Sequence, residues 1–320
     1  MAAGMMVDGK WKTERTEHDR SGKFKSIPTT FRDRVTADGS SGFKAESGRY
    51  HLYISLACPW AHRTLIMRNL KGLQEVIGLS IVAPLVSDKG WAFSEEPGAI
   101  PDSVNHARYL QEIYLKADPK FTGRITVPVL WDKEKGTIVN NESREIMRMF
   151  DVEFDAIAQS DLDLYPSELR AKIDETIDAI YSPINTGVYG GGFATTQEAY
   201  EEAVTELFGN LDRWESVLSS QRYLCSNQLT EADVCLFVTL FRFDSVYYGL
   251  FKCNLRRIVD YPNLWNYLKD VYQYPGIQET CNLDYTKRGY YTGMTEINPN
   301  RIVPKGPLIN FEEKHDRNRF

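Results

Sequence analysis

Short apolar runs alternate with amphipathic runs between residues 49 and 150, and this order restricts the fold of the 320-residue chain more than any other feature. The run RYHLYISLA is short and rich in apolar residues, as a buried strand is. The next segment repeats its apolar residues at helical spacing. The sequence predicts, in order, a strand over 49–57, a helix over 61–73, a strand over 77–86, a helix over 106–117, a hairpin over 126–141 and a helix over 142–150.

This order is that of a thioredoxin-like α/β unit, which we expect at residues 45–152. Residues 1–44 are polar, with Gly-rich pieces and little periodicity, and predict an N-terminal extension. Four apolar residues of the arm can pin it onto a folded body: Phe24, Ile27, Phe31 and Phe43.

The second half of the chain is predicted to be helical. Residues 153–166 form a polar linker, and residues 167–281 an all-helical domain. An amphipathic stripe with steps of 3 and 4 residues comprises Val204, Leu207, Leu211, Trp214 and Leu218. The pair Thr230 and Asp233 has the spacing of a capping box before an apolar helix. Residues 282–320 are rich in Pro and Gly, lack periodicity, and are expected to be a C-terminal extension.

Composition excludes several classes of function. The chain holds 38 basic and 44 acidic residues, a net charge of −6, and has no dense basic run, which argues against nucleic acid as a partner. No apolar run approaches the ~18 residues of a membrane span, and the charged start lacks the apolar core of a signal peptide, so we expect a soluble, cytoplasmic protein. The five cysteines are odd in number and lack metal-ligand spacing, which favours neither a disulfide framework nor a metal site.

Cys58 is the candidate nucleophile. It lies in ACPWAHR, where the first strand gives way to a helix, and a helix N-terminus favours the thiolate form through its dipole and free N–H groups. Pro59 suits the first helical position. Taken without context, a cysteine is more often a buried structural residue. Because position 61 is alanine, this turn has no second thiol, and Cys58 should react with an external one.

Two further segments add to this signal. Val127 precedes Pro128 at the start of the hairpin, and a cis bond there would present the Val127 backbone to an extended peptide. Glu142 and Ser143 open the next helix, where they can hold an ammonium group while helix N–H groups hold a carboxylate. Taken alone, Val127–Pro128 would be an ordinary edge-strand proline, and Glu142–Ser143 would be a helix cap. In this order after Cys58, the two segments strengthen the prediction of a thiol site.

The sequence resembles the Xi class of glutathione transferases, the glutathionyl-hydroquinone reductases, over nearly its whole length. The resemblance rests on GRYHLYISLACPWAHRTLI, RITVPVLWDK, NNES, NTGVYGGGFA and LTEADV. Trp60 after Cys-Pro is more specific than the fold, since Omega-class thiol transferases typically have Phe there. The resemblance implies that Cys58 is the catalytic thiol and that glutathione, as cosubstrate, is held by Trp91, Arg124, Val127, Glu142 and Ser143. Without it, Trp91 would be read as a packing residue and Arg124 as a surface charge.

The resemblance also implies a second-substrate pocket with three tyrosines, Tyr189, Tyr290 and Tyr291. The family's C-terminal segment commonly reads Asp-His-Ile-Lys, one residue, then His-Tyr-Tyr. This chain has DYTKRGYY over 284–291, so Tyr285 and Gly289 stand where the family has histidines. This departure leaves the thiol chemistry intact and leaves substrate preference open.

The implied activity is glutathione-dependent removal of glutathione from glutathionyl-hydroquinones through a Cys58 mixed disulfide, releasing hydroquinone and glutathione disulfide. An Omega-like thiol transferase or dehydroascorbate reductase would use the same cysteine without an aromatic pocket. A non-catalytic carrier of glutathione conjugates or phenolics would have an ordinary, slowly alkylated Cys58. The family further implies a homodimer, and the cysteine spacing leads us to expect no bound metal.

Overall fold

The computed structural model describes residues 4–13, 19–25 and 28–320. The chain divides into two compact units. Unit 1 comprises Met1–Thr16, Ile27–Leu162 and Glu279–Val303, and unit 2 comprises Glu17–Ser26, Asp163–Gln278 and Pro304–Phe320. The chain therefore passes from unit 2 back into unit 1 at residue 279 and ends in unit 2.

A four-stranded mixed sheet forms the centre of unit 1. The strand order is β4–β3–β6–β7, with β4 parallel to β3 and the β3–β6 and β6–β7 pairs antiparallel. Every residue of β3 is buried. These strands span Tyr50–Ile54 (β3), Gly78–Ile81 (β4), Val129–Asp132 (β6) and Thr137–Asn140 (β7). The expected thioredoxin-like topology is confirmed, with strands shorter than their apolar runs.

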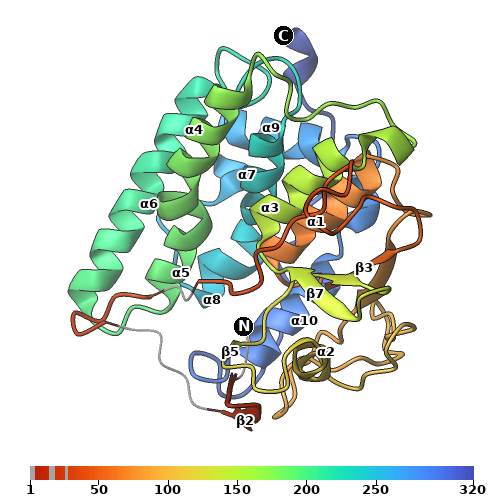
Figure 1. Cartoon of the computed structure of the whole chain (residues 1–320). Coiled ribbons are helices and arrows are strands. Elements are labelled where there is room, and N and C mark those ends of the chain that lie inside the picture. Colours follow the sequence, from red (N-terminus) through yellow and green to blue (C-terminus); the bar gives the residue numbers. More distant parts are fainter. Residues whose placement is uncertain (1–3, 14–18, 26–27) are drawn as a thin grey trace. The chain divides into compact units, whose positions relative to one another are not determined.

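Helices cover both faces of this sheet. The helices α1 (Pro59–Leu70) and α3 (Ser143–Arg148) pack together on one face, and α2 (Leu110–Ala117) lies on the other (Figure 1). α3 continues into a π turn over Met149–Glu153 and a 3₁₀ turn over Asp155–Ile157. Helix α1 begins five residues after β3 ends, so its amino end lies next to the end of this central strand.

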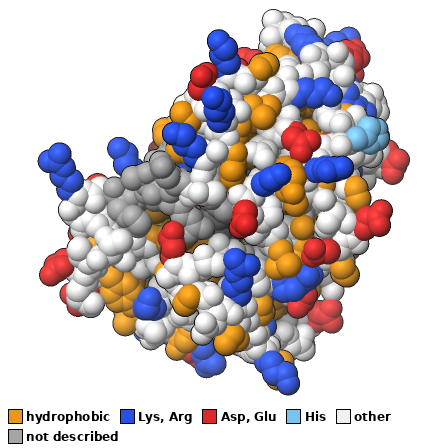
Figure 2. Space-filling model, turned by 90° about the horizontal axis from the view of Figure 1, so that it is seen from below, with side chains coloured by type: hydrophobic (Ala, Val, Ile, Leu, Met, Phe, Trp, Pro, Cys, Tyr) orange, Lys and Arg blue, Asp and Glu red, His pale blue; other side chains and the backbone are white. Residues whose placement is uncertain are grey.

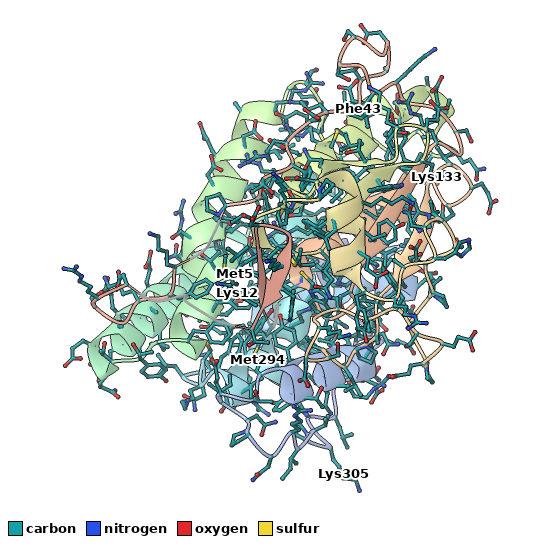
Figure 3. All side chains as sticks on the ribbon, turned by 60° about the horizontal axis from the view of Figure 1, so that its bottom comes forward. Met5, Lys12, Phe43, Lys133, Met294 and Lys305 are labelled. Carbon is teal, nitrogen blue, oxygen red and sulfur yellow. The ribbon has the colours of Figure 1, made fainter. Side chains whose placement is uncertain are left out.

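A small second sheet in unit 1 was not expected from the sequence. Strand β1 (Met5–Val7) pairs with β2 (Lys10–Lys12) on one side and with β5 (Gly123–Arg124) on the other. Figure 3 shows the paired residues Met5 and Lys12 of this hairpin beside each other. Strands of two or three residues are too short to produce a periodic signal, which is why the arm looked irregular.

The apolar residues expected to pin the arm belong to different units. Phe31 stacks on Phe121 with a centroid separation of 5.6 Å, and Phe43 is buried, both within unit 1. Phe24 stacks on Tyr189 at 6.2 Å within unit 2. Ile27 lies outside the described residues.

Helix α10 (Leu283–Gly293) belongs to unit 1 and was missed by the sequence analysis. Asn282 caps its amino end by accepting from the Tyr285 N–H at 2.9 Å. Its sequence LDYTKRGYYTG is rich in glycine, threonine and tyrosine, which have modest helix propensity. Contacts with the rest of unit 1 therefore stabilise this helix.

Unit 2 is helical, as predicted. Helix α7 lies at its centre with every residue buried, and it contacts α4 and α9 (Figure 1). The predicted capping box is present, with Asp233 accepting from the Thr230 N–H at 2.9 Å. The helices span Arg170–Ile180 (α4), Gly187–Gly192 (α5), Gln197–Val217 (α6), Glu231–Arg242 (α7), Tyr248–Leu250 (α8) and Pro262–Tyr272 (α9). Shorter turns span Tyr181–Thr186, Phe243–Tyr247, Ile258–Asp260, Gln278–Thr280 and Arg317–Arg319.

The surface carries both charge signs. Figure 2 shows Lys and Arg side chains interspersed with Asp and Glu over the face that it draws, in agreement with the mixed charge of the sequence. Among the described residues, no helix combines the length and apolar character that crossing a membrane requires.

Candidate active site

Cys58 occupies the N-cap position of α1, with Pro59 as the first helical residue. Its backbone is extended (φ −79°, ψ 119°), which directs the chain from β3 into the helix. The side chain is 5% exposed, and the Sγ–H donates to the Val127 carbonyl at 3.5 Å. This position at the helix amino end favours the thiolate form.

The segment opposite Cys58 is Val127–Pro128, which has a cis peptide bond as the fold predicted. Tyr114 of α2 supports this segment, because its hydroxyl donates to the carbonyl of the preceding Thr126 at 2.8 Å. Val127 is itself buried. The thiol and the Val127 backbone, separated by 69 residues in sequence, are therefore neighbours.

Trp91 and Arg124 are both linked to the small sheet. Arg124 lies on β5 and pairs with Met5. Trp91 follows Gly90, whose position is covered by the Trp11 ring, and the Trp11 indole donates to the Asp88 carbonyl at 2.8 Å. Trp91 is buried, and its indole N–H has no acceptor within the described part of the chain.

Glu142 and Ser143 stand at the start of α3, as predicted. Glu142 is the N-cap, and its carboxylate accepts from the Arg144 N–H at 3.3 Å and from the Thr29 hydroxyl at 3.2 Å. Ser143 is buried, and its hydroxyl lies 3.5 Å from the Glu142 carboxylate. The capping role and a ligand-binding role are compatible, because a carboxylate accepts several hydrogen bonds.

Helix α10 packs directly against the residues that precede Cys58. The Thr286 hydroxyl donates to the Leu56 carbonyl at 3.2 Å, and the Tyr285 hydroxyl donates to the Val82 carbonyl and lies 3.4 Å from the Ser55 hydroxyl. Burial raises the pKa of Tyr285. Further along the same helix, Gly289 lies directly against Ala57.

Two of the three tyrosines lie in unit 1, and the third lies in unit 2. Tyr290 is fully buried in unit 1, and the adjacent Tyr291 is half-buried, with its pKa raised by burial. Tyr189 belongs to unit 2, where its hydroxyl lies 3.5 Å from that of Tyr247 and its ring packs on Phe251 at 5.4 Å. Tyr189 is thus part of an aromatic cluster in unit 2.

Within the described residues, no group of three or more His, Cys, Asp or Glu side chains has the geometry of a metal site. Cys58, Cys225, Cys235, Cys253 and Cys281 are all free thiols, and Cys281 is the one among them that is not buried.

Comparisons with known proteins agree with this architecture. The model "Glutathione S-transferase, N-terminal domain" matches residues 57–153, and "Glutathione S-transferase, C-terminal domain" matches residues 197–270. The solved structure of a Xi-class glutathione transferase from Natrialba magadii superposes with a TM-score of 0.94 at 51% identity, covering 99% of this chain and 97% of the other. The chain belongs to the Xi class of glutathione S-transferases.

Curated relatives are similar over nearly their whole length. The glutathionyl-hydroquinone reductase YqjG of Escherichia coli K12 is 50% identical over 98% of both chains. The glutathionyl-hydroquinone reductase PcpF of Sphingobium chlorophenolicum is 46% identical over 95% of this chain and 96% of its own. The glutathione-bound structure of YqjG has a TM-score of 0.91 at 49% identity, covering 99% and 100% of the two chains.

Three features of this Xi-class transferase escaped the sequence analysis. Trp11 holds the loop before Trp91, Thr286 ties α10 to the Cys58 turn, and Asn298 braces the chain after α10 by donating to the Tyr291 carbonyl at 2.6 Å. Trp11 was an isolated aromatic in a polar arm, so no pattern marked it. The departure at Gly289 was noticed, and it signals the close approach of α10.

Proposed function

We propose that this protein is a glutathione-dependent reductase that removes glutathione from glutathionyl-hydroquinones. The observation that carries the proposal is the thiol of Cys58 at the amino end of α1, facing the Val127 backbone, in a chain about half identical to glutathionyl-hydroquinone reductases from end to end. A cysteine that only fills space in the core would not need to lie at the amino end of a helix.

In this proposal glutathione lies along the segment opposite Cys58. The Val127 backbone pairs with its cysteinyl residue, and Glu142 and Ser143 hold its γ-glutamyl end. Arg124 binds a carboxylate, for which a guanidinium is suited. Trp91 supports the assignment, because its buried indole N–H lacks an acceptor among the described residues and a ligand oxygen would satisfy it.

The proposed chemistry has two exchange steps. The aryl ring first takes its keto tautomer, in which the carbon bearing sulfur has gained a proton. The Cys58 thiolate attacks the glutathionyl sulfur, the carbon–sulfur bond breaks, and its electron pair returns to the ring as hydroquinone anion. A second glutathione thiolate then attacks the Cys58–glutathione disulfide, releasing glutathione disulfide and the Cys58 thiolate.

Tyrosine hydroxyls are proposed to stabilise the ring oxygen as it gains charge in the first step. Tyr290 and Tyr291 are supported by the contacts of α10 with residues 55–57, which bring this helix to the Cys58 turn. Tyr189 is proposed on the family resemblance. Hydroxyl donors aimed at a developing oxyanion are an effective source of catalysis.

The bounds of the glutathione-binding domain at 45–152 and of the helical domain at 167–281, and assembly as a homodimer, are further proposals that rest on the family. Light scattering of the purified protein gives a mass of one or two chains and tests the dimer directly.

The decisive experiment is turnover of a glutathionyl-hydroquinone and of glutathionyl-menadiol with glutathione, following hydroquinone and glutathione disulfide together. Cys58→Ser should lower the rate by at least about a thousandfold, as removal of a nucleophile does. Cys281→Ser is the matched control and should keep wild-type activity. Full activity of Cys58→Ser would refute the mechanism, and faster turnover of hydroxyethyl disulfide than of either conjugate would favour a general thiol transferase.

A further inference from the structure

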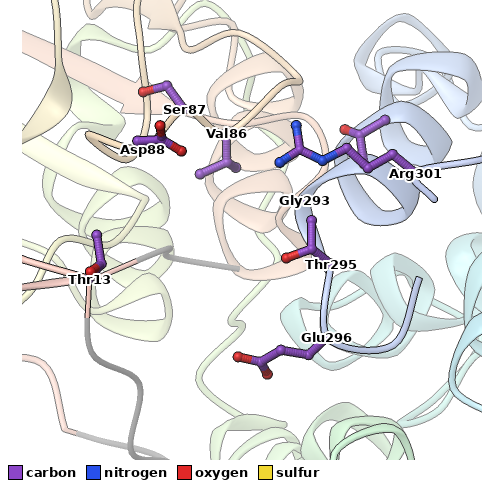
Figure 4. A pocket seen from close by; sticks show the side chains of 9 residues that line it. Thr13, Val86, Ser87, Asp88, Gly293, Thr295, Glu296 and Arg301 are labelled. Atoms are coloured by element: carbon purple, nitrogen blue, oxygen red, sulfur yellow. The ribbon is translucent and has the colours of Figure 1, made fainter. Parts of the chain in front are cut away.

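A pocket of about 380 Å³ opens in unit 1 beside the carboxyl end of α10. One wall is the loop before Trp91, with Val86, Ser87 and Asp88; the other is the end of α10 and the chain after it, with Thr292, Thr295 and Arg301 (Figure 4). Thr13, which follows the N-terminal hairpin, completes it. None of the residues that were assigned to glutathione or to the ring lines this pocket.

The pocket lies close to the Cys58 turn. Along one face of α10, Gly289 lies against Ala57, and a Cβ added at Gly293, four residues on, would stand 3.6 Å from Val86 at the pocket wall. Four helical residues advance about 6 Å. The pocket therefore begins roughly one helical turn from the residue that precedes Cys58.

Hydrogen bonds fix the backbone at Arg301, and Arg301 and Asp88 are both exposed to solvent. Arg301 has a left-handed backbone (φ 54°), uncommon for a residue with a side chain, and its N–H donates to the Asn298 carbonyl at 3.0 Å. Asn298 in turn donates to the carbonyls of Tyr291 and Ile302 at 2.6 and 3.1 Å. In Figure 4 the Arg301 guanidinium extends toward Val86 and Gly293.

One cation and one anion are available to a ligand. Within the described residues no carboxylate pairs with Arg301, and Asp88 has no basic partner, whereas the neighbouring Glu296 has an interaction of its own. Hydroxyls of Thr13, Ser87, Thr292 and Thr295 lie around them, and Val86 is the one apolar side chain among the described residues that line the pocket. A hydroquinone ring would need apolar or aromatic walls. A zwitterion with hydrogen-bonding capacity fits this lining better.

We propose that this pocket docks the second, resolving glutathione by its γ-glutamyl head, with Arg301 on the carboxylate and Asp88 on the ammonium group. The proposal rests on the function proposed above. The γ-glutamyl head and the thiol of glutathione lie on neighbouring residues, about 8 Å apart when extended, so a head in the pocket can direct the thiol toward the Cys58 turn. The docked thiolate attacks the glutathionyl sulfur of the mixed disulfide, the bond to Cys58 breaks, and glutathione disulfide leaves.

The test isolates the second exchange step. Cys58 is first loaded by reaction with glutathione disulfide, and its release by added glutathione is followed by mass spectrometry. Arg301→Ala and Asp88→Ala should each lower the second-order rate constant about tenfold, the effect of losing one charge-assisted hydrogen bond. Arg301→Lys should lie between, and Arg256→Ala, an exposed arginine of unit 2, should have no effect.

Small thiols separate docking from general damage. Dithiothreitol lacks the γ-glutamyl head, so it should resolve wild type and Arg301→Ala at equal rates, and cysteinylglycine should do the same. γ-Glutamylcysteine should depend on Arg301 as glutathione does. Equal rates for Arg301→Ala and wild type with glutathione, or an equal loss with dithiothreitol, would overturn the proposal.

The first exchange step tells the remaining outcomes apart. In a single turnover without added glutathione, Arg301→Ala should release hydroquinone as fast as wild type. A slowed release would mean that the pocket holds the conjugate, against our proposal. Failure of wild type to release any hydroquinone would refute the proposed function alone, because the resolving step is measured without a hydroquinone.

Discussion

Gly289 lies so close to Ala57 that a Cβ at position 289 would stand 2.6 Å from the Ala57 Cβ and 3.4 Å from the Pro84 carbonyl oxygen. No side chain fits there without movement of α10 or of the turn that carries Cys58. A histidine at this position, which the family resemblance leads us to expect, would require α10 or the Cys58 turn to move. Tyr285, at the other departure, fastens the same helix to Val82 and Ser55.

Replacing Gly289 by alanine should destabilise the protein and reduce turnover. Alanine gains about 1 kcal/mol in helix propensity, but overpacking at Ala57 costs about 1–3 kcal/mol and displaces the turn before Cys58. Gly209→Ala in α6 is the control, because nothing lies within 4 Å of a Cβ added there. Urea unfolding and hydroquinone release measure the two effects; equal stability of both variants would contradict the packing argument.

Trp11 should contribute to glutathione binding although it lies in the N-terminal arm. Its indole fastens the loop that leads to Trp91, and the adjoining strand β1 pairs with Arg124. Trp11→Ala should weaken glutathione binding about fivefold, equivalent to roughly 1 kcal/mol, with little change in kcat at saturating glutathione. Titration calorimetry gives the binding constant, and Lys10→Ala, on the same hairpin, is the control. Unchanged affinity in Trp11→Ala would show that the loop holds its position without the arm.

The parts of the fold with strong periodicity were predictable, and the parts built by single contacts were not. The strand, turn and helix around Cys58, the hairpin after Val127 and the capping box at Thr230 each have a local pattern that fixes them. Helix α10 and the small sheet have none: the first depends on Gly289 and Thr286 meeting residues far away in sequence. The proposed glutathione-binding residues come from the family resemblance, since an isolated Trp91 or Arg124 has no local signal.

His51 should make the stability of unit 1 depend on pH. Its Nε2 lies 2.8 Å from the Ser80 hydroxyl, which itself donates to the Pro101 carbonyl, so the ring donates as a neutral imidazole. Burial lowers the pKa of His51 from 6.5 to about 4. The unfolded chain takes up this proton first, so the free energy of unfolding should fall as the pH drops from about 6.5 to 4, by about 3 kcal/mol at most.

His51→Gln retains a donor toward Ser80 and cannot take up a proton in this range. The difference in unfolding free energy between wild type and variant should therefore shrink as the pH falls from 6.5 to 4. Denaturant unfolding at three or four pH values measures it. A difference that is constant over this interval would mean that His51 takes up its proton at the same pH in the folded protein as in the unfolded chain.

Alkylation should separate the cysteines by environment. Burial raises the pKa of Cys225 and raises that of Cys253 to about 12, so at pH 7.5 both are protonated and shielded. Cys58 lies at the amino end of a helix, and Cys281 is half-buried where the other cysteines are buried. Brief treatment with iodoacetamide should therefore label Cys58 and Cys281, and glutathione disulfide added beforehand should protect Cys58 much more than Cys281. Mass spectrometry of the digested protein reads each site. Slow labelling of Cys58, at the rate of Cys253, would favour a carrier of glutathione conjugates, because the exchange mechanism requires a reactive thiolate.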